Sequence, residues 1–257
     1  MFFCAPYAYP PAGLFSLGHL ILFLLSAAGV AVALFFSRSM DAPSIRRTVR
    51  ILTAVLWVME VGKILFVLLV AGSRNPNDFV PLYYCSIVLY AGALSSLPEG
   101  TLRRAGDCFL ATAGLVGGVA YLISPTSTLL QYPAFHVLSL HSFFLHGAMI
   151  YLGLLLLIRG VYRPVFRDIL YPATIISVVC ALALLFNLVY DRANGVAVAN
   201  LMFLSKNTPG TPLAWIWRAT GRFYTPFMWI VQAYGPFLLA FWATELFRKI
   251  KQRKKQT

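Results

Sequence analysis

Residues 132–151 read Tyr-Pro-Ala-Phe-His-Val-Leu-Ser-Leu-His-Ser-Phe-Phe-Leu-His-Gly-Ala-Met-Ile-Tyr, and they place three of the chain's 4 histidines in one apolar stretch. An imidazole in hydrocarbon is costly unless it faces other protein groups or a water-filled cavity. His136 falls at the mouth of the expected helix, His141 a turn deeper and His146 nearer the middle of the membrane. The stretch therefore predicts a membrane helix that forms one wall of a functional pocket.

The composition predicts the same class of protein. Of 257 residues, 60% are hydrophobic and 11% are charged, with a mean hydropathy of +0.76, whereas a soluble domain carries about 25% charged residues. No internal repeat of the kind found in many transporters is evident, so a single integral membrane domain over residues 1–257 is expected. Segments of about 17–25 apolar residues can cross a bilayer. They predict an all-α polytopic bundle of about seven transmembrane helices, at residues 14–36, 49–72, 81–97, 106–124, 137–159, 167–190 and 223–246.

The basic residues indicate the orientation of the bundle. Most of the 21 lysines and arginines lie after the first, third and fifth predicted spans and in a tail at residues 248–257. The positive-inside rule therefore predicts an outside N-terminus and a cytoplasmic C-terminus. The net charge of +13 is explained by this asymmetry and by attraction to anionic lipids at the cytoplasmic face, and it does not indicate nucleic-acid binding. No cleaved signal peptide is expected, because the first span is too long and no positive charge precedes it.

Further polar residues fall inside or beside the predicted spans. Glu60 and Lys63 are three residues apart and so are neighbours on one helix face. They are expected to form a mutually neutralised pair that holds helices together or lines a polar cavity. Alternatively, one of them serves as a proton or substrate group. His19 lies in the first span. Asn200 lies in an apolar stretch before the last span, which is expected to be interfacial or re-entrant. Its amide is expected to cap a turn or, alternatively, to orient a histidine or donate to an oxyanion.

Cys85 is the candidate nucleophile. The third predicted span opens Pro81-Leu82-Tyr83-Tyr84-Cys85, and proline is accepted in the first turn of a helix. This placement puts Cys85 near a helix N-terminus, where the dipole favours a thiolate. A cysteine–histidine pair can transfer an acyl group through an acyl-enzyme. By helix rise alone, His141 matches the depth of Cys85 better than His146 does.

The histidine spacing disfavours a metal site. Steps of five residues turn each imidazole by roughly 140° from the last, so they do not form the i, i+4 pair of a helical zinc site. No acidic ligand lies nearby in sequence, and no cofactor is expected. A site built from several helices, with a contribution from His19, is the minor alternative.

Several motifs, in their order and spacing, resemble a known family. They are Leu17-Gly18-His19-Leu20, Glu60 with Lys63, Pro81 to Ser86, a glycine-rich fourth span ending at Pro125, Tyr132 to Gly147, and Asn200 to Leu204 before a lysine. In these features the chain is similar to the YwaF-like family of bacterial integral membrane proteins, which extends to the animal transmembrane protein 164 acyltransferases.

The resemblance implies a chemistry. In the animal members, a cysteine at the start of one span and a histidine in a later span are implicated in transferring a polyunsaturated acyl chain onto ether phospholipids, in a fold like that of the androgen-induced hydrolases. Carried over by motif, the pair falls on Cys85 and His146. The expected substrate is a membrane phospholipid or acyl-lipid, in a pocket formed by His19, Glu60, Lys63, His141 and Asn200. Leu145 replaces the family's serine and the segment before His146 is slightly longer, so His141 competes as the base.

Three functions follow from these residues. The favoured one is a phospholipid acyltransferase or thiol-dependent lipid hydrolase. The second is a proton- or ion-coupled transporter that uses the intramembrane Glu, Lys and His residues, and the third is a structural protein. The motifs favour a bacterial cell membrane. In a eukaryote, Lys254-Lys255 would resemble a retrieval signal for the endoplasmic reticulum.

Overall fold

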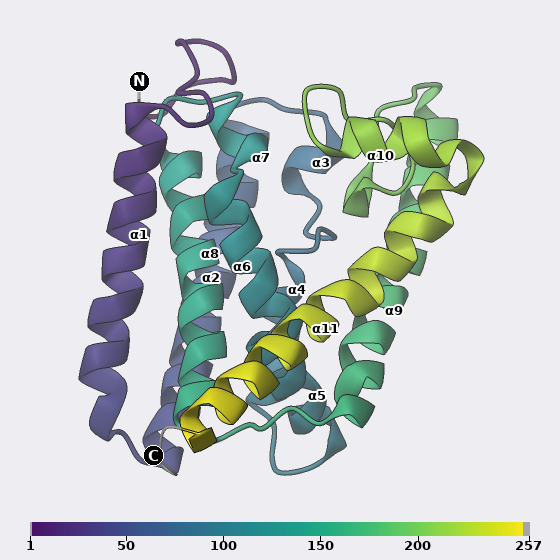
Figure 1. Cartoon of the computed structure of the whole chain (residues 1–257). Helices are drawn as coiled ribbons and strands as arrows, with labels where there is room; N and C mark the ends of the chain where they lie inside the picture. Colours follow the sequence, from purple (N-terminus) through teal and green to yellow (C-terminus); the bar gives the residue numbers. More distant parts are fainter. Residues whose placement is uncertain (1, 254–257) are drawn as a thin grey trace.

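The computed structural model describes residues 2–253, and every regular element in that range is helical (Figure 1). The predicted all-α membrane fold is confirmed. Lys254-Lys255 lies outside the described residues. Six helical segments of the described chain are long and apolar enough to cross a membrane: Leu17–Ser39, Ala42–Leu69, Thr101–Leu129, Val137–Ile158, Phe166–Asn194 and Leu213–Arg253.

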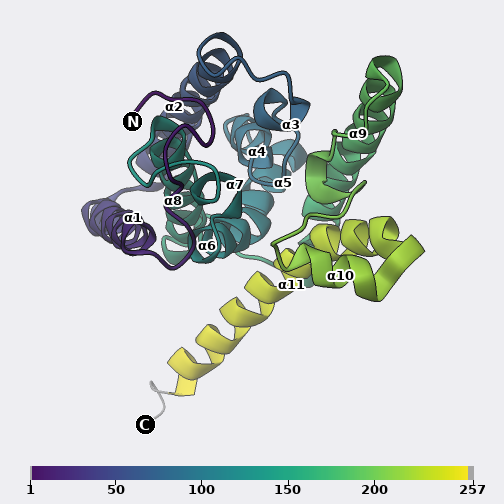
Figure 2. The ribbon, with the colours of Figure 1, turned by 90° about the horizontal axis from the view of Figure 1, so that it is seen from above.

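The histidine-bearing stretch forms the central helix, α8 (Val137–Ile158), which is the most buried of the six spans. It packs against α1 (Leu17–Phe36), α2 (Ala42–Leu69) and α6 (Leu115–Ile123), and in Figure 2 it lies between these three helices. Glycines allow the close approach. A Cβ on Gly118 of α6 would lie 2.9 Å from the backbone oxygen of His146, and one on Gly153 of α8 would lie 2.7 Å from that of Leu110.

The third predicted span is wrong in its first half. Residues 81–97 contain only α4 (Ile87–Ser95), which follows α3 (Pro76–Phe79) and an irregular segment at residues 80–86. Pro81 therefore does not start a helix, and its backbone oxygen accepts a hydrogen bond from Tyr90 Oη at 3.1 Å. Non-helical backbone at membrane depth is tolerated only where protein or a cavity surrounds it. The described chain thus has six helices long and apolar enough to cross a membrane, and α4 is not one of them.

The next span contains a break that holds this irregular segment in place. α5 (Thr101–Phe109) continues through a π-helical turn, η2 (Leu110–Gly114), into α6, and the short α7 (Thr126–Leu129) follows. Tyr84 Oη donates to the backbone oxygen of Ala113 inside this turn at 3.1 Å. Single π turns inside α-helices are frequent at functional sites.

Charged residues join helices at the end of the bundle predicted to face the cytoplasm. Arg46 of α2 donates to both carboxylate oxygens of Asp107 in α5, at 2.5 and 2.7 Å, and Ser95 donates to the same carboxylate at 2.5 Å. Arg104 binds Asp168 in the same two-pronged way, at 3.1 and 2.8 Å. These contacts fix α2, α4, α5 and the start of the span at Phe166–Asn194 relative to one another.

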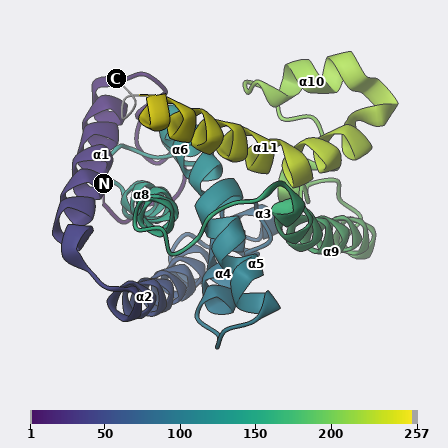
Figure 3. The ribbon, with the colours of Figure 1, turned by 60° about the horizontal axis from the view of Figure 1, so that its bottom comes forward.

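The last third of the chain packs beside the bundle. It contains α9 (Leu170–Asn194), α10 (Leu213–Thr220) and α11 (Tyr224–Arg253). Figure 3 shows α11 crossing α6, with α9 and α10 near its N-terminal end. The remaining elements are short helical turns: η1 (Ser37–Ser39), η3 (Phe166–Ile169), η4 (Leu201–Phe203) and η5 (Gly221–Phe223).

Candidate functional site

Cys85 lies in the irregular segment between α3 and α4. Each residue from 77 to 85 is partly exposed, whereas Cys108 and Cys180 are fully buried. The two tyrosines before Cys85 are anchored in opposite directions. The Tyr83 ring lies 5.2 Å from the Phe203 ring, and the Tyr84 hydroxyl is bound in the π turn. The segment therefore presents a partly exposed Cys85 from a backbone that is held on both sides.

Three predicted site residues form a charged cluster between α2 and α8. Lys63 Nζ donates to Glu60 Oε1 at 2.6 Å, and Glu60 Oε2 lies 3.7 Å from His141 Nε2. Glu60 is 1% exposed. The structure thus brings together three of the predicted site residues: Glu60, Lys63 and His141.

His146 is held from two directions. Its Nδ1–H donates to the backbone oxygen of Ser142 at 2.6 Å, because a carbonyl oxygen can only accept. Its ring stacks on Tyr121 with 3.6 Å between centroids and 9° between planes. A neutral imidazole with a proton on Nδ1 has its lone pair on Nε2, so His146 is in the tautomer that a general base needs.

The other two histidines support the fold. His19 accepts from the backbone N–H of Phe15 through Nδ1 at 3.1 Å, and its Nε2 donates to the backbone oxygen of Leu122 at 2.9 Å, which ties α1 to α6. His136 caps α8 by accepting from the N–H of Leu138 at 3.2 Å. Burial lowers the pKa of His136, which keeps this cap in its neutral, accepting form.

Asn200 organises its own loop. Its Oδ1 accepts from the backbone N–H groups of Ser205 and Lys206, each at 3.0 Å. The plainer of the two interpretations of Asn200, a turn-stabilising amide, describes these contacts. The polar atoms of both His19 and Asn200 are therefore engaged in structural hydrogen bonds.

The sequence of this chain is similar to that of a known protein family. A model of the TMEM164 family matches residues 14–244, from before α1 into α11. The chain belongs to the TMEM164 family. No curated protein and no solved structure was found to match it. The matched range contains every candidate residue discussed above, and the protein is an integral membrane member of this family.

A buried loop of this TMEM164-family protein lies beside the candidate site. Leu201 and Met202 are fully buried, and Met202 and Phe203 both have left-handed backbone, with φ of 56° and 53°. Such angles are uncommon outside glycine. Asn187 of α9 binds both the N–H and the carbonyl of Leu201, and Gln232 of α11 donates to the carbonyl of Met202 at 3.1 Å. These bonds hold Phe203 against Tyr83 and pack the apolar stretch against α9 and α11.

Sequence reasoning missed Tyr121 as a partner of His146. Tyr121 follows Gly117 and Gly118 in an otherwise apolar span, and its Oη lies 2.6 Å from Thr128 Oγ1. A large aromatic residue after a glycine pair was the available signal. It indicates a close packing site but does not identify the partner ring.

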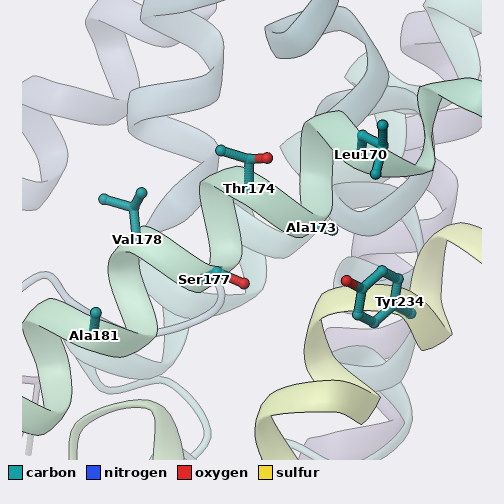
Figure 4. A pocket seen from close by; sticks show the side chains of 7 residues that line it. All are labelled: Leu170, Ala173, Thr174, Ser177, Val178, Ala181 and Tyr234. Carbon is teal, nitrogen blue, oxygen red and sulfur yellow. The ribbon is translucent and has the colours of Figure 1, made fainter.

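The described TMEM164 chain also has a groove elsewhere. It has a volume of about 350 Å³ and lies between α9 and α11, with Tyr234 on one side and α9 residues such as Thr174 and Ser177 on the other (Figure 4). It includes none of the candidate site residues. Within residues 2–253, no group of three or more His, Cys, Asp or Glu side chains is arranged to hold a metal ion.

Proposed function

We propose that this TMEM164-family protein is a membrane-embedded acyl-lipid enzyme in which Cys85 is the nucleophile and His146 the base. The observation that supports it best is a buried His146 whose Nδ1 proton is bound by the Ser142 oxygen, which leaves Nε2 basic. The partly exposed Cys85, in a segment anchored on both sides, is the nucleophile that the proposal pairs with it. The substrate class is a phospholipid of the predicted outer leaflet. The enzyme lies in the bilayer, and the acyl esters of phospholipids are the commonest electrophiles there.

The chemistry divides into two steps. His146 Nε2 takes the proton of the Cys85 thiol as the sulfur attacks the ester carbonyl of the lipid. The C–O bond breaks, the leaving alkoxide takes the proton from His146, and a thioester on Cys85 remains. A hydroxyl group then attacks the thioester, the C–S bond breaks, and the thiol is restored. The partly exposed aromatic rings of Tyr83 and Phe203 suit the acyl chain of the intermediate.

The charged cluster supports a second candidate function. Ionisable groups buried in a membrane protein often mark proton or ion pathways, and Glu60, Lys63 and His141 form such a group across α2 and α8. A transporter that uses them would produce flux in proteoliposomes. That flux would survive loss of Cys85 but not loss of Glu60, whereas lipid chemistry would be abolished by loss of Cys85.

The His146→Asn variant tests the proposed enzyme. Asparagine keeps an amide near Nδ1 that can donate to the Ser142 oxygen, but it removes the basic Nε2. General-base catalysis contributes typically about 10²- to 10⁴-fold, so acyl release or transfer from labelled phospholipid in defined liposomes should fall by about that factor.

The matched control is Cys180→Ala, which removes a fully buried thiol in α9 far along the chain from the candidate pair. It should retain wild-type turnover. Wild-type turnover by His146→Asn would refute His146 as the base. Liposomes that show flux without any change in acyl composition would favour the transporter.

A further inference from the structure

The charged cluster contains an unsatisfied nitrogen. His141 is only 9% exposed, and its buried Nδ1 has no hydrogen-bond partner among residues 2–253. Leaving a buried polar atom unpaired costs about 1–3 kcal/mol, so native proteins rarely keep one without a reason. The atom indicates a place where a ligand atom binds.

The contacts of the same ring define what that ligand must be. Nε2 lies 3.7 Å from Glu60 Oε2, and a carboxylate attracts the N–H side of an imidazole. Glu60 is itself oriented by Lys63, which donates to its other oxygen at 2.6 Å. With the proton on Nε2, the unpaired Nδ1 carries a lone pair. Its partner must therefore be a donor, and a hydroxyl group is the donor that acyl transfer requires.

We propose that His141 is a second base, which binds and deprotonates the acceptor hydroxyl in the step that empties the acyl-enzyme. This inference rests on the proposed function and assigns separate tasks to the two histidines. His146 activates Cys85 for acylation, and His141 activates the acceptor for deacylation. Glu60 is the positioning residue that fixes the tautomer of His141, as the orienting acid does in other nucleophile–base–acid sites.

The deacylation step balances as follows. The acceptor O–H proton moves to His141 Nδ1 while its oxygen attacks the thioester carbonyl on Cys85. The new C–O bond forms, the C–S bond breaks, and the thiolate takes a proton back from the imidazolium. His141 suits this task because its Nε2 side faces Glu60 and its buried Nδ1 is left for the acceptor hydroxyl. The acceptor is a hydroxyl group, from either a lysophospholipid or water.

The two histidines make the inference testable as a split between half-reactions. His141→Gln places an amide near Nε2, which keeps a donor toward Glu60, and it removes the Nδ1 lone pair. Protein in liposomes is mixed rapidly with phospholipid labelled in its acyl chain, quenched, and analysed for acyl-protein thioester over time. The variant should acylate at the wild-type rate but lose the acyl group about 10²- to 10⁴-fold more slowly, so that thioester accumulates. Glu60→Gln should also slow deacylation relative to acylation, so that thioester accumulates.

Two arms identify the acceptor. If added lysophospholipid speeds deacylation of the wild type but not of His141→Gln, the acceptor is a lipid hydroxyl. If the wild-type rate is the same without it, and the variant is slow in both, the acceptor is water.

Three results would overturn the inference. His141→Gln that deacylates at the wild-type rate would exclude His141 as this base. A variant whose acylation and deacylation fall in parallel would assign His141 a structural or acylation role instead. A wild-type protein that forms no thioester would refute the proposed function itself, and the second base with it. Thermal unfolding of His141→Gln in detergent, compared with wild type, separates loss of folding from loss of chemistry.

Discussion

Replacing Cys85 with alanine is expected to abolish acyl transfer and lipid hydrolysis to the background of protein-free liposomes. The sulfur is the only protein atom in the proposed chemistry that bonds covalently to the acyl group, and alanine offers no substitute. Removal of a nucleophile that acts together with its base can cost about 10⁶-fold in turnover. The assay is release or transfer of a labelled acyl chain from defined phospholipid, measured beside flux of protons in the same vesicles.

Cys85→Ala should not disturb the fold. Cys85 is partly exposed and lies outside any helix, so truncating it leaves no sealed cavity. Cys85→Ser adds a more conservative test, since serine is a poorer nucleophile at the same place and should retain only a trace of activity. Cys108→Ala and Cys180→Ala remove buried thiols and serve as controls. Full activity in Cys85→Ala would end the acyl-enzyme account.

Replacing Arg46 with alanine is expected to destabilise the fold by about 3–5 kcal/mol, the cost of leaving one charge of a buried pair uncompensated. Asp107 is 4% exposed and would lose two hydrogen bonds, at 2.5 and 2.7 Å, with only Ser95 remaining. The contact joins α2 to α5, so the loss should loosen the whole end of the bundle. Thermal unfolding of the purified protein in detergent measures it.

An exposed ion pair provides the control for this prediction. Arg103 lies 3.2 Å from Glu99, whose side chain is 91% exposed, and such pairs contribute about 0–1 kcal/mol. Arg103→Ala should therefore unfold almost as the wild type does. Replacing Arg46 and Asp107 together with apolar residues should recover much of the loss, because no charge is then left unpaired. If Arg46→Ala and Arg103→Ala lowered the unfolding temperature equally, the Arg46–Asp107 ion pair would not be a buried stabilising contact.

Hydropathy predicted most of the fold, and the third span shows where it stops. Residues 81–97 are apolar enough to read as a helix, but the backbone before Ile87 is irregular. The hydrogen bond from Tyr84 depends on a π turn in a different helix, and the bond from Tyr90 to Pro81 depends on how α4 folds back. Such tertiary contacts leave no periodic pattern in the sequence.

The candidate site could be predicted only in part, because its tertiary contacts also leave no pattern in the sequence. The Glu60–Lys63 pair follows from helical spacing alone, and the structure contains it. The approach of His141 to Glu60 requires knowing how α2 and α8 pack, which spacing does not give. His19 was grouped with the pocket because a polar residue in a membrane reads as functional by default, yet both of its nitrogens bind backbone.

The central claim is a thioester between the lipid acyl group and Cys85, and mass spectrometry of the intact protein tests it most directly. His141→Gln, incubated with a phospholipid of one defined acyl chain and quenched in acid, should gain the mass of that acyl group. Fragmentation should place the mass on Cys85, and neutral hydroxylamine should remove it. A protein that hydrolyses or transfers the acyl chain without ever carrying it, or that carries it on another residue, would contradict the account.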